Sequence, residues 1–245
     1  GYYYNEYLRS DWRYTLSSTD VTNIDDDASL YIKEQAGTTT LSSLGHTLLY
    51  DERDSKIEPS RGYYLKLGTE FAGLGGSEQF VRATTSAGKY FKLAEDTVLM
   101  FGASAGYMWG YSDRKISITQ RFYLGGDTLR GFEDAGVSPR DKATRDPLGG
   151  LWQYTGTANL TFPVGAPKEM GIKGKLFVDA GGIGKTDSSV PSSKVYSSSA
   201  PRMSIGTGVI WTSPMGPINI DLAVPVIKKD YDETEFFRLN FGTRF

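Results

Sequence analysis

The stretch from Gln120 to Phe132 reads QRFYLGGDTLRGF and lies inside a long segment, residues 111–150, that lacks the alternation of a β-strand. It contains a double glycine, Gly125-Gly126, and then a single arginine, Arg130, followed directly by a third glycine. Glycines on both sides of one arginine predict tight backbone turns that direct this side chain at a fixed target. Strand-like sequence flanks the segment on both sides. We therefore expect an ordered loop, uncommon at this length and usually functional, folded into a hollow β-structure.

The composition favours β-structure and leaves a membrane location open. No run of 18 apolar residues occurs in the 245-residue chain, which excludes a transmembrane helix. A transmembrane barrel alternates apolar and polar residues, so its mean hydropathy, here −0.36, resembles that of a soluble protein. The 16 tyrosines and 29 glycines suit a barrel with aromatic belts at the membrane interfaces. The absence of cysteine rules out a disulfide framework and a thiolate metal site.

Ten strands are predicted from the period-two alternation of apolar and polar side chains. They cover about residues 8–16, 44–50, 63–71, 80–93, 99–109, 153–162, 175–182, 203–211, 218–224 and 237–245. Residues 23–43 are predicted to be an acidic, polar loop, and connections after the second, fourth, sixth and eighth strands are shorter than the others. This pattern is typical of an all-β, antiparallel transmembrane barrel. A soluble β-sandwich shows the same alternation and is the alternative.

Several motifs, in a fixed order, resemble those of one family. QRFYLGGDTLRGF resembles the loop-six signature of the BamA outer-membrane protein assembly factors, whose superfamily also contains TamA proteins, two-partner-secretion transporters and the mitochondrial sorting component. The superfamily motif Val/Ile-Arg-Gly-Phe/Tyr is matched, with Leu in first place, by Leu129, Arg130, Gly131 and Phe132. A second signature, Phe-x-Asp-x-Gly, is matched by Phe177, Asp179 and Gly181. YDERDSKIEPSRG, GVIWTSPMGPINIDLAVPV and NFGTRF resemble further family segments.

The resemblance implies a domain organisation. The family's barrel has sixteen strands and follows periplasmic POTRA domains. Residues 1–245 are therefore expected to be the C-terminal portion of an outer-membrane barrel, with about ten of sixteen strands present and the POTRA domains and N-terminal strands absent. Some relatives place a glutamate opposite the motif arginine on the strand after the loop. Asn159 is expected at that place here, so a cluster of three charges is not expected.

The resemblance also implies roles for the matched residues. Arg130 and Asp179 are expected to face the lumen as a bidentate pair that pins the loop to the inner wall, with Gly131 allowing close approach and Phe132 wedged against the wall. From the residues alone, without the resemblance, the favoured interpretation of Arg130 is a solvated loop charge. The final strand is expected to face lipid and, by resemblance, to act as an assembly signal and one lip of a lateral gate. The residues expected to form this surface are Phe237, Leu239, Phe241 and Phe245.

The function implied is the insertion of client barrel proteins into the outer membrane of a Gram-negative bacterium, through a lateral seam and without ATP. Expected partners are outer-membrane lipid, unfolded outer-membrane proteins and accessory lipoproteins of a BAM complex, but no nucleic acid. The alternatives are a TamA-like or two-partner-secretion translocation pore, and a passive porin. No enzyme activity, cofactor or metal is expected. The single histidine, His46, is interpreted as a membrane-interface residue, and Asp25 to Asp27 as a solvated loop without EF-hand spacing.

Overall fold

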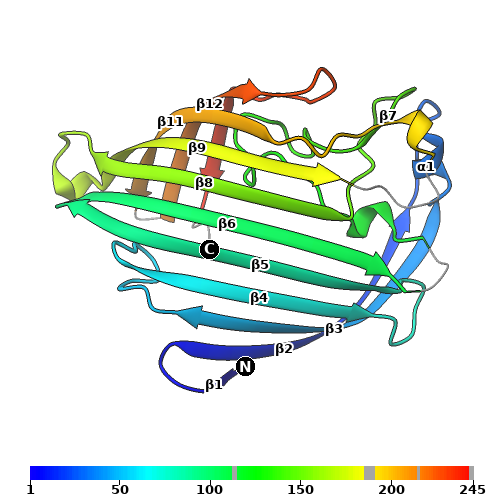
Figure 1. The fold of residues 1–245 in the computed structure, drawn as a ribbon, viewed down its shortest axis with the longest axis horizontal. Coiled ribbons are helices and arrows are strands. Elements are labelled where there is room, and N and C mark those ends of the chain that lie inside the picture. Colours follow the sequence, from blue (N-terminus) through cyan, green and yellow to red (C-terminus); the bar gives the residue numbers. More distant parts are fainter. Residues whose placement is uncertain (112–114, 185–190, 214–215, 243–245) are drawn as a thin grey trace.

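A computed structural model describes residues 1–111, 115–184, 191–213 and 216–242. Eleven strands form one antiparallel sheet in which each strand pairs with its neighbour along the chain (Figure 1). The strands are β1 Tyr2–Tyr3, β2 Leu8–Val21, β3 Gly37–Asp51, β4 Gly62–Ala72, β5 Phe80–Ala94, β6 Thr97–Gly110, β8 Trp152–Pro163, β9 Ile172–Gly184, β11 Arg202–Ser213, β12 Gly216–Ile227 and β13 Phe237–Phe241. All ten predicted strands are present, and β1 is an additional short one. Within the described residues, no helix has the length and apolar character needed to cross a bilayer.

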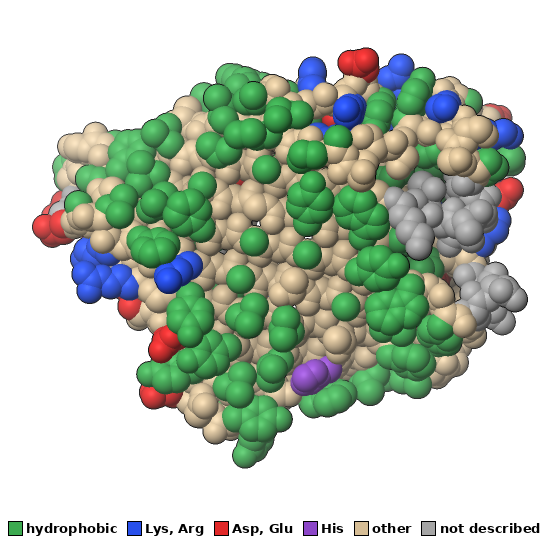
Figure 2. All heavy atoms as spheres, in the orientation of Figure 1, with side chains coloured by type: hydrophobic (Ala, Val, Ile, Leu, Met, Phe, Trp, Pro, Cys, Tyr) green, Lys and Arg blue, Asp and Glu red, His purple; other side chains and the backbone are tan. Residues whose placement is uncertain are grey.

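The apolar side of the strands is the exposed side. Trp12 is 65% exposed and Phe101 is 49% exposed, and most large apolar side chains of the other strands are exposed in the same way. Figure 2 shows these side chains spread over one broad face of the sheet, with few charges among them. A sandwich would bury this face against a second sheet. The sandwich alternative is therefore wrong, and the exposed apolar face suits contact with lipid tails.

The sheet curves around the central segment but does not close. β1 and β13 stand at opposite ends of the strand order, and β12 and β13 curl behind the front strands in Figure 1. Residues of the central segment contact the inward side of several strands: Gln120 meets Arg82 of β5, Phe122 lies over Gly106 of β6, and other residues reach β9 and β13. The structure is a partial barrel with a loop in its interior.

Two expectations about the connections are corrected. β3 begins at Gly37 rather than near residue 44, because residues 37–43 continue the pairing with β2. These residues are mainly threonine and serine, so they lack the apolar alternation that marks a strand in sequence. The strict alternation of connection lengths also fails, since the 73–79 connection is shorter than the 52–61 connection. A short helix, α1 Leu30–Lys33, lies within the acidic, polar segment 23–43.

The central segment is ordered by short pairings and buried side chains. It contains the 3-10 turn η1 Ile118–Gln120, the two-residue strand β7 Arg140–Asp141 and isolated bridges that join Phe122 to Gly150 and Leu124 to Val137. β7 pairs with β10 Val195–Tyr196 from the connection between β9 and β11. Two further 3-10 turns are η2 Lys168–Met170 and η3 Ser192–Lys194. The interior loop thus has its own packed structure.

The 52–61 connection is organised by one carboxylate, which gives a pH prediction. Asp54 accepts hydrogen bonds from the Ser60 amide at 2.9 Å and from the Arg61 amide at 3.1 Å. Although burial opposes ionisation, the hydrogen bonds from Ser60 and Arg61 lower the pKa of the Asp54 carboxyl to about 2. The order it confers is expected to be complete above the unfolded pKa near 4 and lost as pH falls through about 2. A carboxyl ¹³C titration of Asp54 with a midpoint near 4 would contradict this.

Candidate functional site

Arg130 and Asp179 form a bidentate ion pair inside the sheet. The Arg130 Nε donates to Asp179 Oδ2 at 2.7 Å and its Nη2 donates to Oδ1 at 2.8 Å, while the Arg130 amide donates to Oδ2 at 3.3 Å. The two side chains are only 6% and 5% exposed. Two parallel bonds in one plane fix both orientation and distance. The interpretation of Arg130 as a solvated loop charge is therefore wrong.

The backbone around Arg130 allows the loop to touch the wall. Gly131 has φ +88°, a conformation that favours glycine, and its carbonyl accepts a hydrogen bond from the Glu235 amide at 3.2 Å. A Cβ atom on Gly131 would lie 3.1 Å from the Cβ of Ser204 on β11 and 3.3 Å from that of Ala223 on β12. Leu129 and Phe132 are fully buried in a cluster whose members are Leu124, Leu129, Phe132, Val137 and Ile183. The motif is thus anchored on both sides of its arginine.

The second motif, Phe177, Asp179 and Gly181 on β9, forms the wall on which Arg130 lies. The Arg130 guanidinium carbon lies 3.4 Å from the centre of the Phe177 ring, which is itself buried. A side chain at Gly206 on β11 would overlap that ring. A Cβ atom added at Gly181 would lie 2.9 Å from the Tyr154 carbonyl oxygen of the neighbouring strand, which is too close for the backbone to accommodate without a shift. Phe177 and Asp179 therefore hold the arginine by a cation–π contact and an ion pair together.

The third group at the pair is a hydroxyl from an unexpected position. Thr157, not Asn159, lies opposite Asp179 in the register of β8 and β9. Its Oγ1 donates to Asp179 Oδ1 at 2.6 Å and accepts from Arg130 Nη2 at 3.3 Å. Asn159 pairs with Phe177 instead, so the expectation for Asn159 is wrong by two residues, which is one step along the same face of the strand. The site contains two charges and a neutral bridging hydroxyl.

The last described strand has the predicted orientation. Phe237, Leu239 and Phe241 of β13 are exposed on the apolar face, and β13 pairs with β12 alone within the described residues. Phe245, the remaining residue assigned to this strand, lies outside the described residues.

Sequence reasoning missed a second buried pair on the same wall. Lys175 of β9 reaches Asp221 of β12 at 2.6 Å, across the intervening strand β11. Gly208 of β11 makes this possible, since a Cβ there would lie 2.8 Å from the Lys175 Cε. The available signal was a glycine at an inward position between two strands that carry inward charges of opposite sign. Such a pair stiffens the three strands as a unit.

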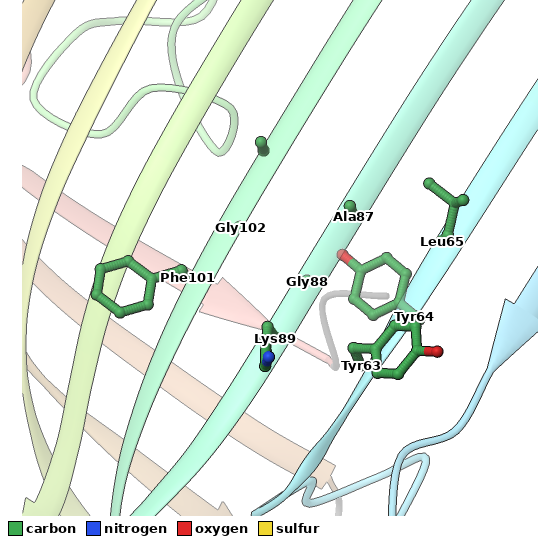
Figure 3. A pocket seen from close by; sticks show the side chains of 9 residues that line it. Tyr63, Tyr64, Leu65, Ala87, Gly88, Lys89, Phe101 and Gly102 are labelled. Carbon is green, nitrogen blue, oxygen red and sulfur yellow. The ribbon is translucent and has the colours of Figure 1, made fainter.

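His46, the single histidine, lies among aromatic and apolar side chains of the exposed face. His46 stacks on Trp12 with 4.4 Å between ring centres and contacts the Ser10 hydroxyl at 2.9 Å, on the apolar face. No group of three potential metal ligands occurs among the described residues. The apolar hollow in Figure 3, about 460 Å³, is a shallow site with a single charged group, Lys89. It is lined by Tyr63, Tyr64, Leu65, Ala87, Gly88, Lys89, Phe101, Gly102 and Ala103.

The fold and the site together define a class of protein: an antiparallel membrane β-barrel, present in part, whose wall is fastened to an interior loop by a buried arginine–aspartate pair. The arrangement holds the interior loop against the wall. Comparison with known proteins gives the family. The model of the Omp85 superfamily domain matches residues 1–245, so the chain belongs to the Omp85 superfamily.

Individual relatives support this assignment. The chain is 33% identical to the outer membrane protein assembly factor BamA of Neorickettsia risticii, over 97% of this chain and 32% of that protein. It is 31% identical to BamA of Neisseria meningitidis, over 80% of this chain and 28% of that protein. A SAM50-like protein of Schizosaccharomyces pombe is 30% identical over 86% of this chain and 46% of its own length. The chain thus spans about a third of the length of these bacterial relatives.

A solved structure shares the fold. BamA from Haemophilus ducreyi, in a form that lacks POTRA domains 1–3, superposes with a TM-score of 0.72 at 21% identity. The match covers 82% of this chain and 42% of that one. The fold expected from the sequence, an antiparallel barrel of which only part is present, is confirmed.

Proposed function

We propose that this chain is the C-terminal part of the barrel of a BamA-type assembly factor in the outer membrane of a Gram-negative bacterium. Its N-terminal strands and periplasmic POTRA domains would belong to the rest of a longer protein. The full protein would take unfolded outer-membrane proteins from the periplasm and fold them into the membrane. Accessory lipoproteins are proposed as further partners, by the same family resemblance.

The observation that carries this proposal is the Arg130–Asp179 pair, which fastens an interior loop beside a sheet whose last described strand has one neighbour. An unsatisfied strand edge in lipid costs several kcal/mol for each unpaired backbone group. A seam that opens at β13 therefore favours pairing with an incoming strand. The free energy of that pairing drives insertion, so no ATP is required. A passive porin has no use for a loop fastened by two separate motifs.

The test is a cysteine crosslink in the full-length protein reconstituted in liposomes. This chain contains no cysteine, so Leu239→Cys on β13 introduces a single thiol at the proposed seam. It is expected to form a disulfide with a cysteine in the last strand of an unfolded client barrel. The matched control is Ala87→Cys on β5, which faces the same side but lies between two paired strands.

Three outcomes separate the candidates. Crosslinking at Leu239→Cys alone, with client folding in the absence of ATP, supports assembly. Passage of a soluble client through the barrel, without crosslinking, supports the translocation pore of a TamA-like or two-partner-secretion protein. A steady conductance with neither result supports a passive porin and overturns the proposal.

A further inference from the structure

The connection between β12 and β13 carries three acidic residues that each bind a different arginine. We call Asp232, Glu233 and Glu235 the acidic clasp. Asp232 binds Arg202 through two bonds of 2.9 and 3.1 Å. Glu233 binds Arg140 through bonds of 2.6 and 2.8 Å. Glu235 binds Arg238 at 2.6 Å. Three ion pairs from four consecutive positions show that this short connection is bound to the rest of the fold and is not a turn that faces only solvent.

The three arginines come from three different parts of the fold. Arg202 begins β11, Arg140 lies in β7 of the central segment, and Arg238 lies on β13. Backbone bonds strengthen the junction with the central segment: the Glu133 amide donates to the Glu233 carbonyl at 3.2 Å, and the Glu233 amide donates to the Gly136 carbonyl at 3.1 Å. The clasp therefore joins the last hairpin to the interior loop and to β11 at once.

Arg238 makes a direct contact between β13 and the loop that holds the Arg130 motif. Besides Glu235, its guanidinium reaches Asp134 at 3.2 Å and Asp127 at 3.7 Å. Asp127 precedes the motif by two residues and Asp134 follows it by two. An outward displacement of β13 must either break these contacts or move the loop with it.

The contacts of the clasp and those of Arg238 with the loop differ in strength. Arg202 and Asp232 are 1% and 0% exposed, and separation of a fully buried pair leaves an uncompensated charge. Asp127 and Asp134 are 52% and 83% exposed, so their pairs with Arg238 are screened by water and salt. The Arg202 contact is the fixed anchor of the hairpin, and the Arg238 contacts are the ones that can be broken reversibly.

We propose that the acidic clasp and Arg238 are positioning residues that couple the edge strand to the interior loop, so that β13 leaves the seam only when the loop is released. This inference rests on the proposed function, since it assigns a control to the proposed seam. It also predicts that high salt weakens the coupling, because the breakable contacts are the exposed ones.

The test is amide hydrogen exchange on the full-length protein in liposomes, with changes made on one side of the contact and read on the other. Arg238→Gln alters only β13, and it is expected to accelerate exchange in residues 125–134 of the loop. The double variant Asp127→Asn/Asp134→Asn alters only the loop, and it is expected to accelerate exchange in β13. Each effect should be roughly fivefold, the factor that corresponds to about 1 kcal/mol. Raising the salt from 0.1 to 1 M should reproduce both.

The matched control is Asp230→Asn, an exposed acid in the same connection that makes no ion pair with the described residues. It should leave both segments unchanged. Acceleration confined to the mutated segment in both variants would overturn the coupling, because a purely local role changes only its own surroundings. The loop variant is at exposed positions, so it keeps the test valid if Arg238→Gln fails to fold. Crosslinking at Leu239→Cys is measured separately. If the crosslink to the client forms but neither variant accelerates hydrogen exchange in the other segment, the coupling is rejected and the proposed function stands.

Discussion

Replacement of Arg130 by alanine is expected to lower the free energy of unfolding of the barrel by about 3–5 kcal/mol. The change leaves the Asp179 carboxylate, 5% exposed, without its two guanidinium bonds, and only the Thr157 hydroxyl and the backbone amide of residue 130 still donate to it. It also removes the cation from the face of Phe177. The measurement is the denaturant midpoint of the full-length protein, followed by tryptophan fluorescence. Arg61→Ala, at an exposed arginine of the 52–61 connection, is the matched control and should cost less than about 0.5 kcal/mol.

A double-mutant cycle separates the ion pair from other effects of the substitution. Asp179→Ala should destabilise by a similar amount, because it leaves a buried guanidinium unpaired. The double variant Arg130→Ala/Asp179→Ala should cost less than the sum, by about 1.5–3 kcal/mol, since neither charge is then left alone. Full additivity of the two single changes would show that the residues do not act as a pair, despite the 2.7 Å separation of Nε and Oδ2.

The strands and their faces were predictable because the signal for them is local. The alternation of apolar and polar side chains along 99–109 or 153–162 predicts both that a strand forms and which side of it faces lipid. Where a strand leaves the apolar belt, as β3 does over residues 37–43, both sides are polar and the signal disappears although the pairing continues. The pairing register of β8 with β9 could not be predicted from the sequence. The expectation therefore named Asn159, whereas Thr157 lies beside Asp179.

The site was predictable only in part, for a related reason. Arg130 and Asp179 lie 49 residues apart, and only their two family motifs joined them. The pair of Arg140 with Glu233 spans 93 residues and has no such motif. The sequence trace of the clasp was a group of acidic residues just before the last strand, together with arginines at the start of a strand and in the central loop. Such charges are ordinarily solvated, so the sequence alone gave no reason to pair them.

Gly125→Ala is expected to disrupt the interior loop more than a methyl addition at Gly131. Gly125 has φ +126°, a conformation that costs other residues about 1–3 kcal/mol. An added Cβ would also overlap the Glu133 carbonyl oxygen, and backbone cannot move aside as a flexible side chain does. The turn it interrupts is closed by Thr128, whose Oγ1 donates to the Gly125 carbonyl at 2.8 Å. The measurement is again the denaturant midpoint, and the loss should exceed the cost of the dihedral angle alone.

Gly75→Ala provides the control for the dihedral angle. Gly75 has φ +100° in the 73–79 connection, and nothing lies within 4 Å of a Cβ there. Gly75→Ala should therefore show the loss of stability caused by the backbone conformation alone, without a steric clash. Equal losses of stability at Gly75 and Gly125 would mean that the interior loop relaxes around the added methyl group. The double variant Gly125→Ala/Arg130→Ala tests whether the two positions act on the same loop. If both act by releasing the same loop from the wall, the second change finds the loop already released, so the combined loss should fall clearly short of the sum. Additive losses would place the turn at Gly125 and the ion pair at Asp179 in independent parts of the structure.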